Sequence, residues 1–185
     1  YTNTSISNST KKSDANFLNI NSGETVFNIV ENSNVINLRQ VNHFKLGAES
    51  KMEFGFDAEI NDTDYNYYRK LPVSSLFISE IQFDRLISTK NYSAFITLKK
   101  NLFSRLIFSA GMRLDQNDYE KINLLSPRIN LDYELIRGKT NLIINSGLYH
   151  QNPPAIYIAN NASKKLKSVK ARQHSISLEH MLTPS

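Results

Sequence analysis

The feature that most limits the fold of this chain is a period of two in side-chain polarity. Within residues 51–61, apolar side chains fall on every second position, and the positions between them are mostly charged. An extended strand separates such sets onto two faces, whereas a helix would mix them. The same alternation recurs at residues 106–115 and 128–135. The sequence therefore predicts an antiparallel all-β protein.

Weaker copies of the pattern extend this prediction along the chain. They occur at residues 92–99, 141–151 and 175–182, residues 35–46 alternate in part, and residues 26–30 are a possible extra strand. We expect seven strands, and residues 26–30 leave open an eighth. The first two dozen residues are rich in Asn, Ser and Thr and lack periodicity, so we expect residues 1–25 to be a loop or mobile segment.

The connections between the predicted strands alternate in length. Those at residues 47–50, 100–104 and 136–139 are short, and those at residues 62–91, 116–125 and 152–170 are long. In an up-and-down sheet, alternate connections emerge at opposite ends, so one end is smooth and the other carries long loops. This asymmetry is typical of outer-membrane β-barrels, with short periplasmic turns and long extracellular loops. A soluble β-sandwich has no need of it.

The two faces of the predicted strands have different requirements. The polar face of residues 51–61 carries Glu53, Asp57 and Glu59, which are too charged for a packed core and must face water. The opposite face is apolar over about five alternate positions, enough to cross an apolar layer of about 25 Å in a tilted strand. A lipid-facing outside and a wet lumen satisfy both faces. The alternative is a β-sandwich, or a half-exposed sheet, whose apolar face packs on a second layer.

Composition excludes several other classes. The longest apolar run covers residues 155–159, far short of the roughly 20 residues of a membrane-spanning helix. A mean hydropathy of −0.40 would by itself indicate a soluble protein, but a barrel strand gives the same average because it alternates. The chain has no cysteine, which excludes disulfides, thiolate metal sites and a cysteine nucleophile.

The positive charge of the chain does not indicate a nucleic-acid partner. The net charge is +5, but the basic residues are scattered, and the densest group, at residues 164–172, has no interleaved aromatic side chain. A solvated loop is the favoured interpretation of that group, ahead of a phosphate-binding patch. We expect no nucleic acid among the partners.

Catalytic and metal-binding motifs are not found in the sequence. Of the four histidines, only His174 and His180 are close, and six residues of strand separate them by about 20 Å. Asp57 and Glu59 share a face and could support acid–base chemistry. The favoured interpretation is that these two acids face a barrel lumen, where Arg113 and Arg128 balance their charge. We expect no enzyme activity, no metal and no cofactor.

Three short motifs occur in a fixed order in the second half of the chain. They are Gly-Met-Arg-Leu-Asp at residues 111–115, Leu-Ser-Pro-Arg-Ile-Asn-Leu at residues 125–131, and Gly-Leu-Tyr-His-Gln at residues 147–151. In order and spacing they resemble the barrel of TonB-dependent outer-membrane receptors. The resemblance covers roughly residues 35–185.

This resemblance implies a barrel of about 22 strands filled by an N-terminal plug. It also implies a substrate bound at extracellular loops and plug, with uptake driven by the TonB energy-transducing complex. Typical substrates are ferric siderophores, haem, cobalamin or oligosaccharides. The chain has no plug-like sequence and too few strands for such a barrel. We therefore expect residues 26–185 to be an internal part of it, located in the outer membrane in contact with its lipid.

Six residues are candidate contacts for an extracellular small molecule or oligosaccharide. Tyr65 and Tyr67 belong to an aromatic girdle or to a ligand-binding loop, and Tyr149 and Gln151 lie near the loop end of a strand, on the lumen side. The two remaining candidates are the lumen cations Arg113 and Arg128. Two other functions stay open: a smaller outer-membrane barrel acting as a pore or structural protein, and a soluble β-rich binding module.

Overall fold

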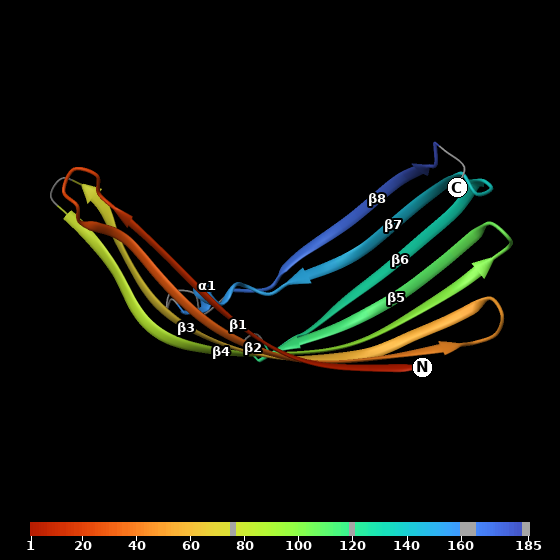
Figure 1. The fold of residues 1–185 in the computed structure, drawn as a ribbon, viewed down its shortest axis with the longest axis horizontal. Helices are drawn as coiled ribbons and strands as arrows, with labels where there is room; N and C mark the ends of the chain where they lie inside the picture. The colour runs from red at the N-terminus through yellow and green to blue at the C-terminus, as the bar shows by residue number, and fades with distance from the viewer. Residues whose placement is uncertain (75–76, 119–120, 160–165, 183–185) are drawn as a thin grey trace.

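The computed structural model describes residues 1–74, 77–118, 121–159 and 166–182, which form one antiparallel sheet (Figure 1). Each strand pairs with its neighbours in the chain, in the order β1 to β8. The strands are β1 (Thr2–Leu18), β2 (Thr25–Lys45), β3 (Ser50–Ser74), β4 (Phe77–Leu102), β5 (Leu106–Asn117), β6 (Asn123–Ile136), β7 (Thr140–Gln151) and β8 (Val169–His180). A short helix, α1 (Ala155–Ala159), precedes β8. The predicted up-and-down β-architecture is confirmed.

The sheet is a curved trough and not a closed barrel. Figure 1 shows the tight turns of the β2–β3, β4–β5 and β6–β7 hairpins gathered at one end, and β1–β4 continuing well beyond β5–β8 at the other. β1 and β8 form the two edges, and within the described residues they do not pair with each other. The described chain therefore forms a section of wall with two open edges.

The expected loop over residues 1–25 is wrong, because residues 2–18 form β1. This strand pairs with β2 along its whole length, from Thr2 opposite Asn42 to Leu18 opposite Thr25. Its side chains are mostly polar on both faces, so it has no polarity period that could reveal it. β2 in turn joins the two segments predicted at residues 26–30 and 35–46 into one strand. Together these changes give eight strands.

The expected long loop over residues 62–91 is also wrong, because β3 and β4 continue through most of it. In this extension the polarity of the faces is reversed. Asp62, Asp64 and Asn66 lie on the face that is apolar lower in β3, and the buried Thr63 and Tyr65 lie on the other. The sequence prediction looked for apolar residues on the same face throughout a strand. It therefore missed this segment, in which the apolar face changes sides while the chain stays extended.

The apolar face of the sheet has no covering layer among the described residues. Phe54, Phe56 and Ile60 of β3 are exposed, as are Ile96 and Leu98 of β4. Tyr65, on the opposite face, is the one hydrophobic side chain of the described residues that is buried. The described residues form a single sheet, so the second layer of a β-sandwich is not found. None of the described helices is long and apolar enough to span a membrane.

Candidate functional site

The centre of the concave face is a charged cluster around Arg113 of β5. Its Nη1 donates to Asp57 Oδ2 at 2.7 Å, its Nε to Asp115 Oδ1 at 2.7 Å, and its Nη2 to Ser93 Oγ at 2.6 Å. Arg39 Nε lies 3.5 Å from the other oxygen of Asp57. The planar guanidinium suits this role, because its fixed donors can reach several acceptors at once.

Strand register produces the cluster. Arg39 is directly opposite Asp57, Asp57 opposite Ser93, and Ser93 opposite Asp115, so one row crosses β2, β3, β4 and β5. Arg113 is two residues from Asp115 and therefore on the same face. The alternation of each strand places all five side chains on the concave side.

A cavity of about 490 Å³ opens over this cluster. It reaches from Ser5 and Ser7 on β1 to His150 on β7, a span that only the concave face can bridge. In its wall, Asn91 Nδ2 donates to Glu59 Oε1 at 3.0 Å, and the lining residue His150 has its Nδ1 3.1 Å from Ser126 Oγ. Its walls carry both signs of charge and many hydrogen-bonding groups, which suits a polar ligand.

A second cavity of about 360 Å³ lies beside the first and shares Arg39 and Arg113 with it. Here the Arg128 guanidinium lies over the Tyr149 ring, 4.6 Å from its centroid. Gly147 permits this contact, because a Cβ at that position would come within 3.0 Å of the Tyr149 ring and 3.2 Å of Arg128 Cγ. The glycine of the Gly-Leu-Tyr-His-Gln motif thus makes room for its tyrosine.

The end of the site away from the tight turns is held by Asn152, just after β7. Its Nδ2 donates to Asn91 at 3.0 Å, and its Oδ1 accepts from Asn117 at 2.9 Å and from Ser168 at 3.0 Å. These bonds join β4, β5 and both ends of the β7–β8 connection. From there α1 packs against β3 and β4. Its Ile156 backbone forms a hydrogen bond with Tyr65, which is only 5% exposed.

Tyr65 provides a test of this packing. Burial, and secondarily the charge of Glu31, raise the pKa of Tyr65 from 10.0 to about 12. Because the folded-state pKa exceeds the unfolded value, the neutral phenol contributes stability that is complete below pH 10 and lost as the pH rises toward 12. We expect ultraviolet titration of the tyrosines to include a late-titrating phenol from Tyr65. Tyr65→Phe should remove it and Tyr92→Phe should leave it; a late phenol that survives in Tyr65→Phe would contradict the assignment.

The structure brings together three of the six predicted contact residues. Arg113 lines both cavities, and Arg128 and Tyr149 line the second. Tyr65 lies under α1, not in a loop. Tyr67 stacks on Phe83 at 4.8 Å between centroids, in the extension of β3 and β4. Gln151 is exposed and lines neither cavity.

Sequence reasoning missed several members of the site: Arg39, Ser93, Asp115, His150 and Asn152. Each is an ordinary polar residue in the sequence. Register brings Arg39 and Ser93 to Asp57, alternation along β5 places Asp115 beside Arg113, and His150 and Asn152 line the first cavity. The alternation within each strand was the available signal, because it placed Arg113 and Asp115 on the polar face of β5. Among the described residues, no group of three or more His, Asp or Glu side chains could hold a metal ion.

Comparison with known proteins identifies the fold. No family model and no curated protein sequence matches the chain. Among solved structures, the copper transporter OprC matches with a TM-score of 0.73 and 15% identity, covering 97% of this chain and 33% of that one. The FpvAI–pyocin S2 complex matches with a TM-score of 0.63 and 14% identity, covering 98% and 29%. The chain thus spans about a third of the length of these structures.

Both neighbours are TonB-dependent receptors. The fold of the described chain is accordingly that of a section of a TonB-dependent receptor barrel, with antiparallel strands in up-and-down order.

Proposed function

We propose that this chain is part of the barrel wall of an outer-membrane receptor that binds a scarce substrate and imports it with TonB-coupled energy. The observation that carries the proposal is the opposite chemistry of the two faces. The concave face holds an ordered charged cluster beneath two cavities, and the convex face carries exposed apolar side chains with no covering layer among the described residues. A transport lumen needs the first and a bilayer needs the second.

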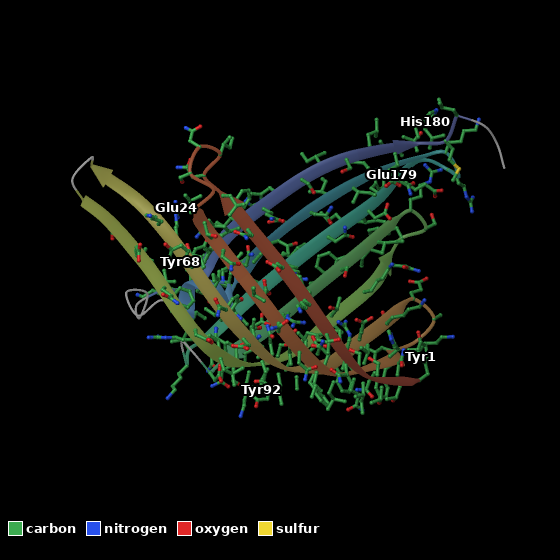
Figure 2. All side chains as sticks on the ribbon, turned by 60° about the vertical axis from the view of Figure 1, so that its left-hand side comes forward. Tyr1, Glu24, Tyr68, Tyr92, Glu179 and His180 are labelled. Atoms are coloured by element: carbon green, nitrogen blue, oxygen red, sulfur yellow. The ribbon has the colours of Figure 1, made fainter. Side chains whose placement is uncertain are left out.

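The height of the apolar face supports a position in a bilayer. On β3 it runs from Met52 to Ile60, which at roughly 3.3 Å per residue and a tilt of about 40° spans about 20 Å, close to the apolar band of about 25 Å in such barrels. The exposed rings of Tyr92 and Phe103 lie near its two ends, as in the aromatic girdles of such barrels. Figure 2 shows Tyr92 on the convex side of the sheet. In the bilayer, further strands would pair with the edges β1 and β8, because exposed backbone groups are costly in lipid.

The proposed partners follow from this arrangement. Outer-membrane lipid contacts the convex face, and an extracellular small molecule or oligosaccharide binds on the concave face near Arg113, Arg128 and Tyr149. The TonB energy-transducing complex acts through a plug region outside this chain. Copper is named for one structural neighbour and pyocin S2 for the other. For this chain we propose a ferric siderophore, haem, cobalamin or an oligosaccharide as the transported substrate.

Whole-cell uptake tests the proposal. We expect deletion of the full-length gene to abolish uptake of one member of a panel of these substrates, and inactivation of the TonB complex to do the same. Arg128→Gln should lower affinity for that substrate about tenfold, since a hydrogen bond to a charged group contributes about 1.5–3 kcal/mol. Arg137→Gln, in the exposed turn before β7, is the matched control and should leave affinity unchanged.

The same assay distinguishes the other candidate functions. Uptake that continues at full rate without TonB would identify a passive pore instead of an active transporter. Recovery of the full-length protein in the aqueous fraction, without detergent, would contradict every barrel function and support the soluble binding module.

A further inference from the structure

Three lysines form a row on the concave face, beside the tight turns. Lys45 of β2 is directly opposite Lys51 of β3, and Lys51 is directly opposite Lys99 of β4. The next residue in the row is the neutral Ser109 of β5. Side chains directly opposite each other have Cβ atoms about 4.5–5.5 Å apart, and like charges in such pairs destabilise a sheet.

No carboxylate of the described residues forms an ion pair with this row, although Glu53 lines the same cavity. All three lysines are exposed, and none forms an ion pair within the described chain. The acid one step further along the same face, Glu53, is 3.4 Å from His43 Nδ1. The row therefore differs from the Arg113 cluster, where each cation faces carboxylates of the chain itself.

The row lines a third cavity, which continues the first two. This cavity has a volume of about 360 Å³ and includes the three lysines with His43. It shares Glu53, Thr97 and Ser109 with the second cavity. Because the second cavity shares two arginines with the first, the three follow one another along the concave face, from the Asn152 network to the tight turns.

We propose that this lysine row is a binding site for a small, multiply charged anion. The ligand carries phosphate or carboxylate groups about 5 Å apart, to match the spacing of opposed side chains. The volume of the cavity suits a small molecule, since ligand sites commonly measure about 300–1,000 Å³. Binding such an anion removes the repulsion among the three ammonium groups.

A role for this site in transport rests on the proposed function. The tight turns mark the periplasmic end of an outer-membrane barrel. A substrate that passes the Arg113 cluster would then meet the lysine row last, so the row would favour an anionic substrate on its way out of the lumen. Anion binding itself does not depend on that function.

Calorimetry on the purified full-length receptor, in neutral detergent at low ionic strength, tests the site with inorganic triphosphate as the probe. We expect Lys51→Gln to weaken triphosphate binding at least about tenfold, as loss of a charge-assisted contact of about 1.5–3 kcal/mol implies. Lys100→Gln is the matched control. Lys100 is adjacent to Lys99 and equally exposed, but strand alternation places it on the opposite face. It should change the affinity less than twofold.

Thermal unfolding provides a second measurement that does not require a ligand. Without triphosphate and at low salt, Lys51→Gln should raise the unfolding temperature relative to Lys100→Gln, because it removes the central charge of the row. Triphosphate should raise the unfolding temperature of the wild type and of Lys100→Gln much more than that of Lys51→Gln.

Two outcomes would overturn the anion site. One is equal triphosphate affinity in Lys51→Gln and Lys100→Gln. The other is a glutamate-rich peptide that binds at the row far more tightly than triphosphate, which would identify an acidic protein segment as the occupant. Neither outcome bears on TonB-dependent uptake, which is measured in whole cells, so this inference and the proposed function can fail separately.

Discussion

Replacing Phe56 by arginine is expected to lower the free energy of unfolding of the full-length protein by about 2–4 kcal/mol, the cost of a charge near the midplane of the proposed lipid-facing surface. Phe56 lies in the middle of the apolar series of β3, 40% exposed and with no covering side chain layer in the described residues. The measurement is reversible unfolding in urea, in lipid vesicles, compared with wild type.

The matched control is the same substitution on the concave face. Asn37 of β2 lines the first cavity directly opposite Glu59, so an arginine there meets water and a carboxylate. We expect Asn37→Arg to change stability by about 0.5 kcal/mol or less. Equal costs at Phe56 and Asn37 would show that the convex face does not contact lipid.

Removing the Arg113 side chain is the second substitution with a large expected effect. Arg113→Ala deletes three short hydrogen bonds and leaves Asp57 and Asp115 on one face without their shared cation. A fully buried ion pair broken in this way costs about 3–5 kcal/mol. The side chains of Arg113, Asp57 and Asp115 are 20–30% exposed, so solvent screening lowers the expected cost to about 2 kcal/mol.

A double-mutant cycle measures the interaction itself. We expect Arg113→Ala and Asp57→Ala together to cost about 1 kcal/mol less than the sum of the single changes, because each removes the partner of the other. Arg113→Lys keeps the charge but not the planar donors, so it should recover only part of the stability. Strictly additive costs would mean that the 2.7 Å contact contributes nothing to folding.

The strands that alternate in polarity could be predicted from the sequence, whereas β1 and the extension of β3 could not. Residues 51–61 and 106–115 alternate strongly because lipid and water select opposite side chains on the two faces. The extension of β3 beyond Asn61 lies outside the proposed bilayer, so this selection is absent there. β1 is mostly polar on both faces, although its register places Thr2 to Asn8 level with Phe54 to Ile60 of β3. These segments are extended because their backbone pairs with a neighbouring strand. Backbone pairing does not require alternating polar and apolar side chains, so the sequence does not reveal it.

The candidate site, too, could be predicted from the sequence only in part. Alternation placed Arg113 on the polar face, and the presence of acids suggested that it would be balanced. Its partner Asp57 is 56 residues away in the sequence, and only the register from β3 through β4 to β5 brings the two within 2.7 Å. Gln151 is the opposite case. It is two residues from Tyr149 and on the same face of β7, but it lines neither the first nor the second cavity.

The unequal lengths of the strands expose an edge of the sheet. β4 first meets β5 at Asn91, opposite Asn117, so residues 77–90 of β4 pair with β3 on one side only. At Lys90, the last residue of this stretch, Asp118 closes the junction with two hydrogen bonds to the Lys90 backbone. From Lys90 toward residue 77, the backbone amide and carbonyl of every second residue of β4 point away from β3. Among the described residues, no strand pairs with that side of β4, so this stretch lacks the second neighbour that the rest of the strand has in β5.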